Sequence, residues 1–160
     1  MIDAKQSDRL LHFFEEMFSF YQDFLAFEQE KYGIIVSGDF AKLDEALKRE
    51  QAFTLKARGM ESERAELLEE IGAEGSTFRE LIPQIEPSRQ KKMQALYEDI
   101  SSAVGRIRQT NERSSRMIQV KMGHVSKVLA NLENHPELKQ IYNDKFNRQL
   151  NAENTFSRKI

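Results

Sequence analysis

The chain alternates between stretches with helical hydrophobic spacing and short breaks, and its first stretch is the most apolar. Residues 13–27 read FFEEMFSFYQDFLAF and hold six of the eleven phenylalanines. At about 100° per residue, the apolar side chains fall on one arc about 200° wide, which predicts an amphipathic helix with two apolar seams. The first seam is Leu11, Phe14, Phe18, Tyr21 and Leu25, and the second is Leu10, Phe13, Met17, Phe20, Phe24 and Phe27.

A helix with two apolar seams contacts two partners, because one coiled-coil seam needs a narrower stripe. One interpretation is a helix packed between two others of its own bundle, with Phe14, Phe18 and Tyr21 as core residues. The alternative is that one seam serves a dimer or a bound client. The pattern does not show which seam packs inside the bundle and which one serves a partner.

Turn and capping residues predict where the first helix ends. The letters VSGDF at 36–40 predict a stop at Gly38 and a new N-cap at Asp39. The helix predicted after this break carries a thinner apolar stripe, which is interrupted by Glu50 and Arg64. We therefore expect a second helix that is less apolar than the first.

The letters GAEGS at 72–76 predict the end of the second helix. Residues 78–89 are expected to form a connector with one short helix before Pro83. Pro87 suits the first position of a helix, so it predicts the start of a third long helix.

The third helix is expected to run to about Glu133 and carries a heptad pattern. Nine of its twelve seam positions are apolar, which predicts a coiled-coil helix of roughly 70 Å and hence an elongated molecule. Asn111 and Ser114 are polar residues within the seam. Either a buried Asn111 sets the register between helices, or the seam is open to water there. The seam positions are Met93, Tyr97, Ile100, Val104, Ile107, Asn111, Ser114, Ile118, Lys121, Val125, Val128 and Leu132.

Pro136 is expected to end the long helix, and apolar residues at three-four spacing follow it. They predict a short amphipathic helix, and the polar tail after it is expected to be mobile. Such a helix either folds back on its own bundle or captures an apolar partner. The candidate binding residues of this segment are Leu138, Ile141, Tyr142, Phe146, Leu150 and Phe156.

The predicted fold class is therefore all-α. We expect an elongated helical bundle, or antiparallel coiled coil, of three long helices plus a short C-terminal amphipathic helix. Residues 1–134 form the predicted body of the bundle. Residues 135–160 form the predicted short helix and tail, which is the candidate client-binding segment.

Composition narrows the functional classes. Charged residues make up 31% of the chain, and the formal net charge is -2 without a basic stripe, which argues against a nucleic-acid partner. The chain has no cysteine, which fits a reducing compartment. It shows no signal peptide and no run of about 18 apolar residues. We expect a cytoplasmic protein without a membrane span, and a homodimer is possible.

The residues that carry enzyme or metal chemistry do not form a recognisable site. His12, His124 and His135 are the only histidines, and none lies in a metal-binding or catalytic spacing. His12 precedes Glu16 by one helical turn, which predicts an exposed pair on the polar face. We expect no catalytic residues, no metal and no cofactor.

Several short motifs resemble the FlgN-type flagellar export chaperones. The likeness is carried by GDF followed by AKLDEALKREQAF, by RIRQTNERSSRMI in the third long helix, and by the late IYNDKF. It covers about residues 8–146. Two features depart from the family pattern: Ser114 and Ser115 stand where a second Asn is frequent, and Phe146 follows the late motif where a small residue is common. The matching positions are Gly38, Asp39, Leu43, Leu47, Lys48, Arg49, Asn111, Glu112, Arg113, Tyr142 and Asn143.

This resemblance implies a cytoplasmic chaperone without catalysis. Such families bind hook-filament junction proteins, which are hook-associated flagellar proteins, prevent their premature assembly, and deliver them to the export apparatus. Their C-terminal region is the usual client-binding part, which corresponds here to residues 135–160. The alternative function is a structural or regulatory homodimeric coiled-coil protein that uses a spare phenylalanine seam and has no export role.

Overall fold

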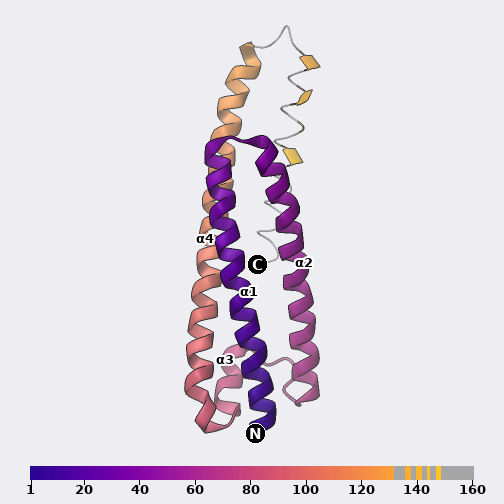
Figure 1. Ribbon diagram of the computed structural model, residues 1–160, viewed down its shortest axis with the longest axis vertical. Helices are drawn as coiled ribbons and strands as arrows, with labels where there is room; N and C mark the ends of the chain where they lie inside the picture. Colours follow the sequence, from indigo (N-terminus) through magenta and orange to yellow (C-terminus); the bar gives the residue numbers. More distant parts are fainter. Residues whose placement is uncertain (132–135, 138–139, 142–143, 145–146, 149–160) are drawn as a thin grey trace. The chain divides into compact units, whose positions relative to one another are not determined.

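The computed structural model describes residues 1–131, 136–137, 140–141, 144 and 147–148. Every regular element among these residues is helical, so the chain is all-α, as predicted. Residues 132–135 are not described, so the expected end of the long helix near Glu133 lies outside the described part. Pro136, which we expected to end that helix, has a helical backbone itself. The elements are α1 (Ala4–Ser37), α2 (Phe40–Glu70), α3 (Phe78–Leu81), the 3-10 turn η1 (Ile82–Gln84) and α4 (Pro87–Asn131) (Figure 1).

The break between α1 and α2 has the chemistry that the sequence predicts. Gly38 adopts a φ of 72°, and its N–H donates to the carbonyl of Ile34 at 3.2 Å. A positive φ of this size is favourable for glycine, because it has no Cβ. The Asp39 carboxylate then accepts a hydrogen bond from the backbone N–H of Lys42 at 3.1 Å, which caps α2. The predicted stop and N-cap are both confirmed.

The connector between α2 and α4 is also confirmed. Gly72 and Gly75 both have positive φ, at 73° and 75°. Thr77 and Glu80 then form a reciprocal capping box that starts α3. The predicted short helix before Pro83 is therefore α3, and α4 begins at Pro87 as expected.

The chain divides into two compact units, and parts of α1, α2 and α4 contribute to each. Unit 1 comprises Met1–Leu25 and Phe53–Arg106, and so it includes α3 and η1. Unit 2 comprises Ala26–Ala52 and the chain from Ile107 onward. The expected elongated shape, and the expected division into a body over 1–134 and a segment over 135–160, stay predictions.

Unit 1 is built around aromatic side chains from four elements. Phe14 of α1 packs against Phe78 of α3, with ring centroids 3.8 Å apart, and Phe78 lies 5.4 Å from Tyr97 of α4. Farther along α1, Phe24 stacks on Phe53 of α2 at a centroid distance of 4.9 Å. The phenylalanine-rich stretch of α1 therefore contacts α2 and α3 within its own chain.

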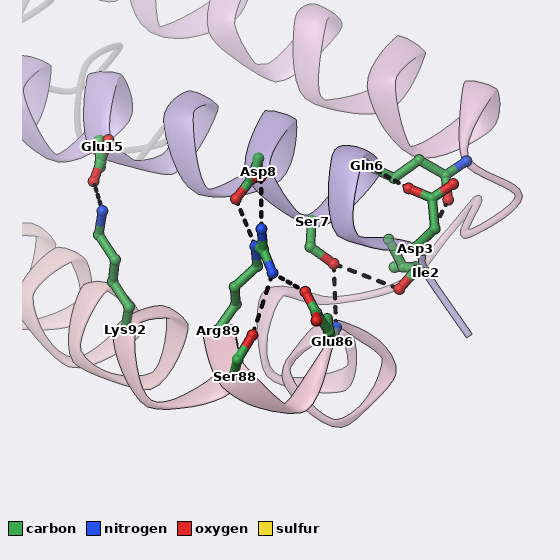
Figure 2. Close-up of polar contacts among 10 residues, drawn as sticks. All are labelled: Ile2, Asp3, Gln6, Ser7, Asp8, Glu15, Glu86, Ser88, Arg89 and Lys92. Carbon is green, nitrogen blue, oxygen red and sulfur yellow. Dashed lines mark hydrogen bonds and ion pairs between the residues drawn. The ribbon is translucent and has the colours of Figure 1, made fainter.

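Polar contacts fix the start of α1 to the start of α4 in unit 1 (Figure 2). Asp8 accepts two hydrogen bonds from the guanidinium of Arg89, one of them at 2.8 Å, and this contact lowers the pKa of the Asp8 carboxyl. The Ser7 hydroxyl accepts a hydrogen bond from the backbone N–H of Glu86 at 3.1 Å. Glu15 and Lys92 form an ion pair one to two turns farther along each helix.

These contacts give the direction of the helices within each unit. In unit 1, Asp8 and Glu15 of α1 meet Arg89 and Lys92 of α4 in the same order, so the two helices are parallel there. In unit 2, Tyr32 and Val36 of α1 likewise meet Arg113 and Lys121 of α4 in order. By contrast, α2 runs antiparallel to α1 in both units. Arg9 and Phe24 of α1 meet Glu70 and Phe53 of α2 in unit 1, and Glu30 and Ile35 meet Arg49 and Leu43 in unit 2. The predicted antiparallel packing thus holds between α1 and α2 but not between α1 and α4, because the chain reverses twice between α1 and α4.

Burial along α1 shows how the two apolar seams are used. All six residues of the second seam are buried, and Leu11, Phe14 and Leu25 of the first seam are buried as well. Phe18 and Tyr21, which we expected in the core, are only half-buried. Phe18 lies at the edge of the apolar arc, and tyrosine commonly leaves its polar tip at the surface. The structure therefore favours packing of α1 between other helices of its own chain.

Burial along α4 follows the predicted seam for most of its length. Met93, Ile107 and Ile118 are fully or almost fully buried. Toward the end of the helix, the predicted seam residue Val128 is 42% exposed, whereas the next residue, Leu129, is buried. A straight α-helix drifts by about 20° per heptad relative to a strict seven-residue repeat, which accounts for this change of face.

Candidate functional site

The predicted client-binding segment is described only in part. Ile141 has helical backbone and a 52% exposed side chain, which makes it one of the few exposed large apolar residues. Gln140 beside it donates a hydrogen bond to the Asp144 carboxylate at 3.1 Å, one turn farther on. The other candidate residues of this segment lie outside the described residues. These are Leu138, Tyr142, Phe146, Leu150 and Phe156.

An apolar pocket of about 190 Å³ lies in unit 2, next to the α1–α2 turn. An engineered apolar cavity of about 150 Å³ accepts benzene, so this pocket has room for a large apolar side chain. Lys121 is one of its lining residues and donates a hydrogen bond to the carbonyl of Val36 at 3.1 Å. The lining residues are Ile34, Ile35, Gly38, Phe40, Leu43, Ile118, Lys121, His124 and Val125.

A cluster of charged side chains is buried in unit 2, one helical turn from this apolar region. Lys31 of α1 has no exposed side-chain surface, and its ammonium lies 3.0 Å from the carboxylate of Glu28 on the same helix. The same ammonium donates to the carboxylate of Glu50 on α2. The side chains of Glu28 and Glu50 are 0% and 4% exposed. We call these three residues the buried charge cluster.

The part of α4 in unit 2 adds buried polar side chains to this region of the chain. Thr110, Asn111 and Ser114 are all buried. The Ser114 hydroxyl has no hydrogen-bond partner among the described residues. Because Asn111 and Ser114 are enclosed, the alternative of a seam that is open to water is wrong. The register-setting role of Asn111 stays a prediction.

The buried charge cluster raises the pKa of one of its carboxyls. Burial raises the pKa of Glu50 to about 7, the ammonium of Lys31 opposes this shift, and the carboxylate of Glu28 adds to it. An exposed carboxyl nearby behaves in the opposite way. Arg49 donates a hydrogen bond to the Glu30 carboxylate at 2.8 Å, and this hydrogen bond lowers the pKa of Glu30.

The sequence analysis missed this cluster, although a signal is present. Glu50 does not interrupt the apolar stripe of α2 as expected, because it is buried within that stripe. Lys31 lies four residues after Phe27 and four before Ile35, so it occupies an apolar position of α1. Two oppositely charged residues, each at a core position of a neighbouring helix, indicate a buried ion pair.

Several other charged residues of the described part form exposed pairs. His12 lies 3.3 Å from Glu16, and both side chains are exposed, which confirms the expected pair. Both residues line a shallow polar groove of unit 1 together with Arg9 and Glu70, which pair at 2.7 Å. Among the described residues, no group of three or more histidines and carboxylates could hold a metal ion.

The comparisons with known proteins identify one family. The family model described as FlgN protein matches residues 1–149, which is most of the chain. No curated protein and no solved structure gives a match. Within the part of the chain that the structure describes, no helix is long and apolar enough to cross a membrane. FlgN is a chaperone family rather than an enzyme family. The chain therefore belongs to the FlgN family of flagellar export chaperones.

Proposed function

We propose that this chain binds hook-filament junction proteins, prevents their premature assembly and delivers them to the export apparatus. The observation that carries this proposal is the family match over residues 1–149, which includes residues 137–149 of the segment after Pro136. The burial of the α1 seams adds support, because the phenylalanine-rich helix is occupied within its own chain. The client is then expected to bind elsewhere.

We place the client on the C-terminal segment. Ile141 is half exposed, and Leu138, Tyr142 and Phe146 share its predicted helix face by three-four spacing. An amphipathic helix with a free apolar face docks readily against an apolar surface of a partner. Leu150 and Phe156 extend the same proposed surface toward the end of the chain.

The test places charges on this face. A chain with both Ile141→Asp and Phe146→Asp must desolvate two carboxylates on binding, which costs several kcal/mol when no partner compensates them. Capture of a purified hook-associated protein should fall at least tenfold, or about 1.4 kcal/mol. The helical circular dichroism signal and the melting temperature should hardly change, because the predicted body lies before this segment.

The matched control carries the same two charges on the opposite face of the segment. Gln140 and Asn147 are both exposed, and helical spacing places them away from the apolar face. Gln140→Asp with Asn147→Asp should therefore leave capture within about threefold of the wild type. If the apolar-face variant melts many degrees lower, the segment belongs to the folded core. If capture is unchanged in both variants, the client binds another surface.

A further inference from the structure

The apolar pocket of unit 2 has a buried side and a side that solvent reaches. Ile35, Leu43 and Ile118 line it from α1, α2 and α4, and they are 3%, 4% and 1% exposed. These three residues pack together as one core group. Lys121 and His124 of α4 also line the pocket, and they are half-buried and exposed, respectively. A bound molecule therefore contacts apolar carbon at its inner end and two nitrogen-bearing side chains at its outer end.

The pocket has open space for a small molecule. Its volume is about 190 Å³, and an apolar cavity of about 150 Å³ holds benzene. Gly38 forms part of its wall, and a Cβ built on Gly38 would meet nothing within 4 Å. The space suits one aromatic ring or one short alkyl chain.

The polar groups of the pocket favour a negative charge. The ammonium of Lys121 donates a hydrogen bond to the carbonyl of Val36 at 3.1 Å. This is the only side-chain polar contact of Lys121 among the described residues, so no carboxylate in that part of the chain pairs with it. An ammonium has further N–H donors, and the ring of His124 supplies another donor. Asp39, which lies between two lining residues, is engaged at the N-cap of α2, where it accepts a hydrogen bond from the N–H of Lys42.

The surface around the pocket fits a small ligand better than a protein partner. A stable protein interface buries roughly 800 Å² on each side and has an apolar centre. Among the described exposed residues next to lining positions in the sequence, only Val36 and Val120 are large and apolar. The others are polar or small, namely Gly33, Ser37, Ala41, Lys42, Asp44, Gln119, Gly123 and Ser126. The pocket is thus an isolated apolar space within a largely polar surface.

We propose that this pocket binds a small anionic amphiphile, whose carboxylate pairs with Lys121 while its alkyl or aromatic body fills the apolar space between α1, α2 and α4. The body leaves contact with water on binding, which is the main driving force for apolar groups. The carboxylate receives charge-assisted hydrogen bonds, which are stronger than neutral ones. This inference goes beyond the chaperone function and does not depend on it.

Octanoate is the probe, and the full chain is titrated with it while the isoleucine methyl groups are followed by NMR. The methyl signals of Ile34, Ile35 and Ile118 should shift and saturate, because these residues line the pocket. The signals of Ile85 and Ile100, which are buried in unit 1, should stay in place. Shifts of equal size in both units, or shifts that do not saturate, would overturn the proposal by showing non-specific binding.

The charge of the ligand is tested with octanol and octylamine, which carry the same alkyl chain with a neutral and a positive end. A hydrogen bond to a charged group contributes more than a neutral one, so octanoate should bind at least about fivefold more tightly than either. Equal affinities for the three molecules would mean that the pocket selects only for apolar carbon, and the proposed anion site would be wrong.

Lys121→Gln removes the ammonium but keeps a side-chain N–H donor for the carbonyl of Val36. The octanoate affinity should fall at least about fivefold, whereas the octanol affinity should not change. Lys127→Gln is the matched control, because Lys127 is exposed on the same helix and does not line the pocket. Its octanoate affinity should stay within about twofold of the wild type. Equal losses in the two variants would indicate a long-range effect of charge instead of pairing, and would contradict the proposal.

Val125→Phe tests whether the ligand occupies the pocket itself. Val125 is a half-buried lining residue, so a ring at this position takes up part of the space. The methyl shifts should disappear for both octanoate and octanol, and circular dichroism shows whether the variant is folded. Binding that survives in the folded variant would place the ligand elsewhere and overturn the proposal. If this variant does not fold, the comparison of Lys121→Gln with Lys127→Gln decides.

Two results would assign the pocket to a different occupant, and each would overturn the proposal. If a chain ending at Asn134 binds octanoate and the full chain does not, a later part of this chain covers the pocket. If octanoate converts a dimer into a monomer in sedimentation experiments, a second copy of the chain covers it.

Discussion

Phe14 is fully buried in unit 1, between Phe13 of its own helix and Phe78 of α3. Replacing it by alanine removes a large ring and leaves a cavity, which typically costs about 3–5 kcal/mol. We expect Phe14→Ala to lower the free energy of unfolding by this amount in a urea titration. Phe18→Ala is the control, because Phe18 is half-buried and its loss should stay below about 2 kcal/mol. Equal losses for the two variants would mean that the first seam is enclosed along its whole length.

The hydrophobic pattern determines the burial of some residues and not of others. The burial of Phe14 follows from the hydrophobic pattern, because apolar side chains at helical spacing are driven to one face. The apolar positions that Lys31 and Glu50 occupy are a signal of burial, but the pattern does not decide it, because the same residue types cover most solvent-exposed helix faces. Their enclosure depends on α1 and α2 being paired in one particular register, and that register is a property of the tertiary structure.

At the scale of elements, the boundaries were predictable because they depend on local chemistry. Gly38 and Asp39 end one helix and begin the next through contacts within a few residues, and Thr77 and Pro87 act in the same local way. The parallel arrangement of α1 and α4 within each unit was less accessible. It depends on the number of times the chain reverses direction. The chain reverses once at the α1–α2 turn and again in the connector that contains the predicted short helix, so α4 runs in the same direction as α1.

Alanine substitutions at two glycines near the end of α1 should change the stability of the chain in opposite directions. A Cβ at Gly38 or at Gly33 would meet nothing within 4 Å, so steric contact does not distinguish them. Gly38 has a φ of 72°, whereas Gly33 lies within the helix. Gly38→Ala should therefore destabilise the chain by about 1–2 kcal/mol. Gly33→Ala should stabilise it by up to about 1 kcal/mol, because alanine favours the helix.

Thermal melting by circular dichroism measures both glycine variants. For a chain of this size, about 1 kcal/mol corresponds to roughly 2–4 °C. The melting temperatures of the two variants should thus move in opposite directions. If Gly38→Ala leaves the melting temperature unchanged, the left-handed backbone at the α1–α2 turn does not limit the stability of the chain.

At the scale of the whole molecule, the phenylalanine-rich helix helps to decide between an export chaperone and a homodimeric coiled-coil protein. A homodimeric coiled coil would need an unpartnered apolar seam. In the described part of the chain, the second seam of α1 is fully buried within the protein, and Phe18 and Tyr21 are the half-buried members of the first. The family match independently indicates a chaperone. Together, these observations direct the search for a client toward the segment after α4.

A truncated chain tests the predicted division of the molecule into a body and a client-binding segment. The buried apolar residues of the described part extend from Ile2 to Leu129, so a chain ending at Asn134 retains all of them. We expect this chain to melt within a few degrees of the full chain and to lose capture of a hook-associated protein. A second chain ending at Leu150 keeps the predicted short helix but lacks the last ten residues, and its capture separates the predicted short helix from the tail.

The two possible failures of this prediction have different meanings. If the chain ending at Asn134 melts more than about 8 °C lower, the deleted segment contributes at least about 2 kcal/mol to folding. Residues 135–160 would then belong to the bundle, and folding back on the body would explain their apolar face. If melting and capture are both retained, the segment is not the client-binding part. The apolar pocket lined by Ile34, Phe40 and Val125 would then be the next surface to test, with a charge introduced at Val125.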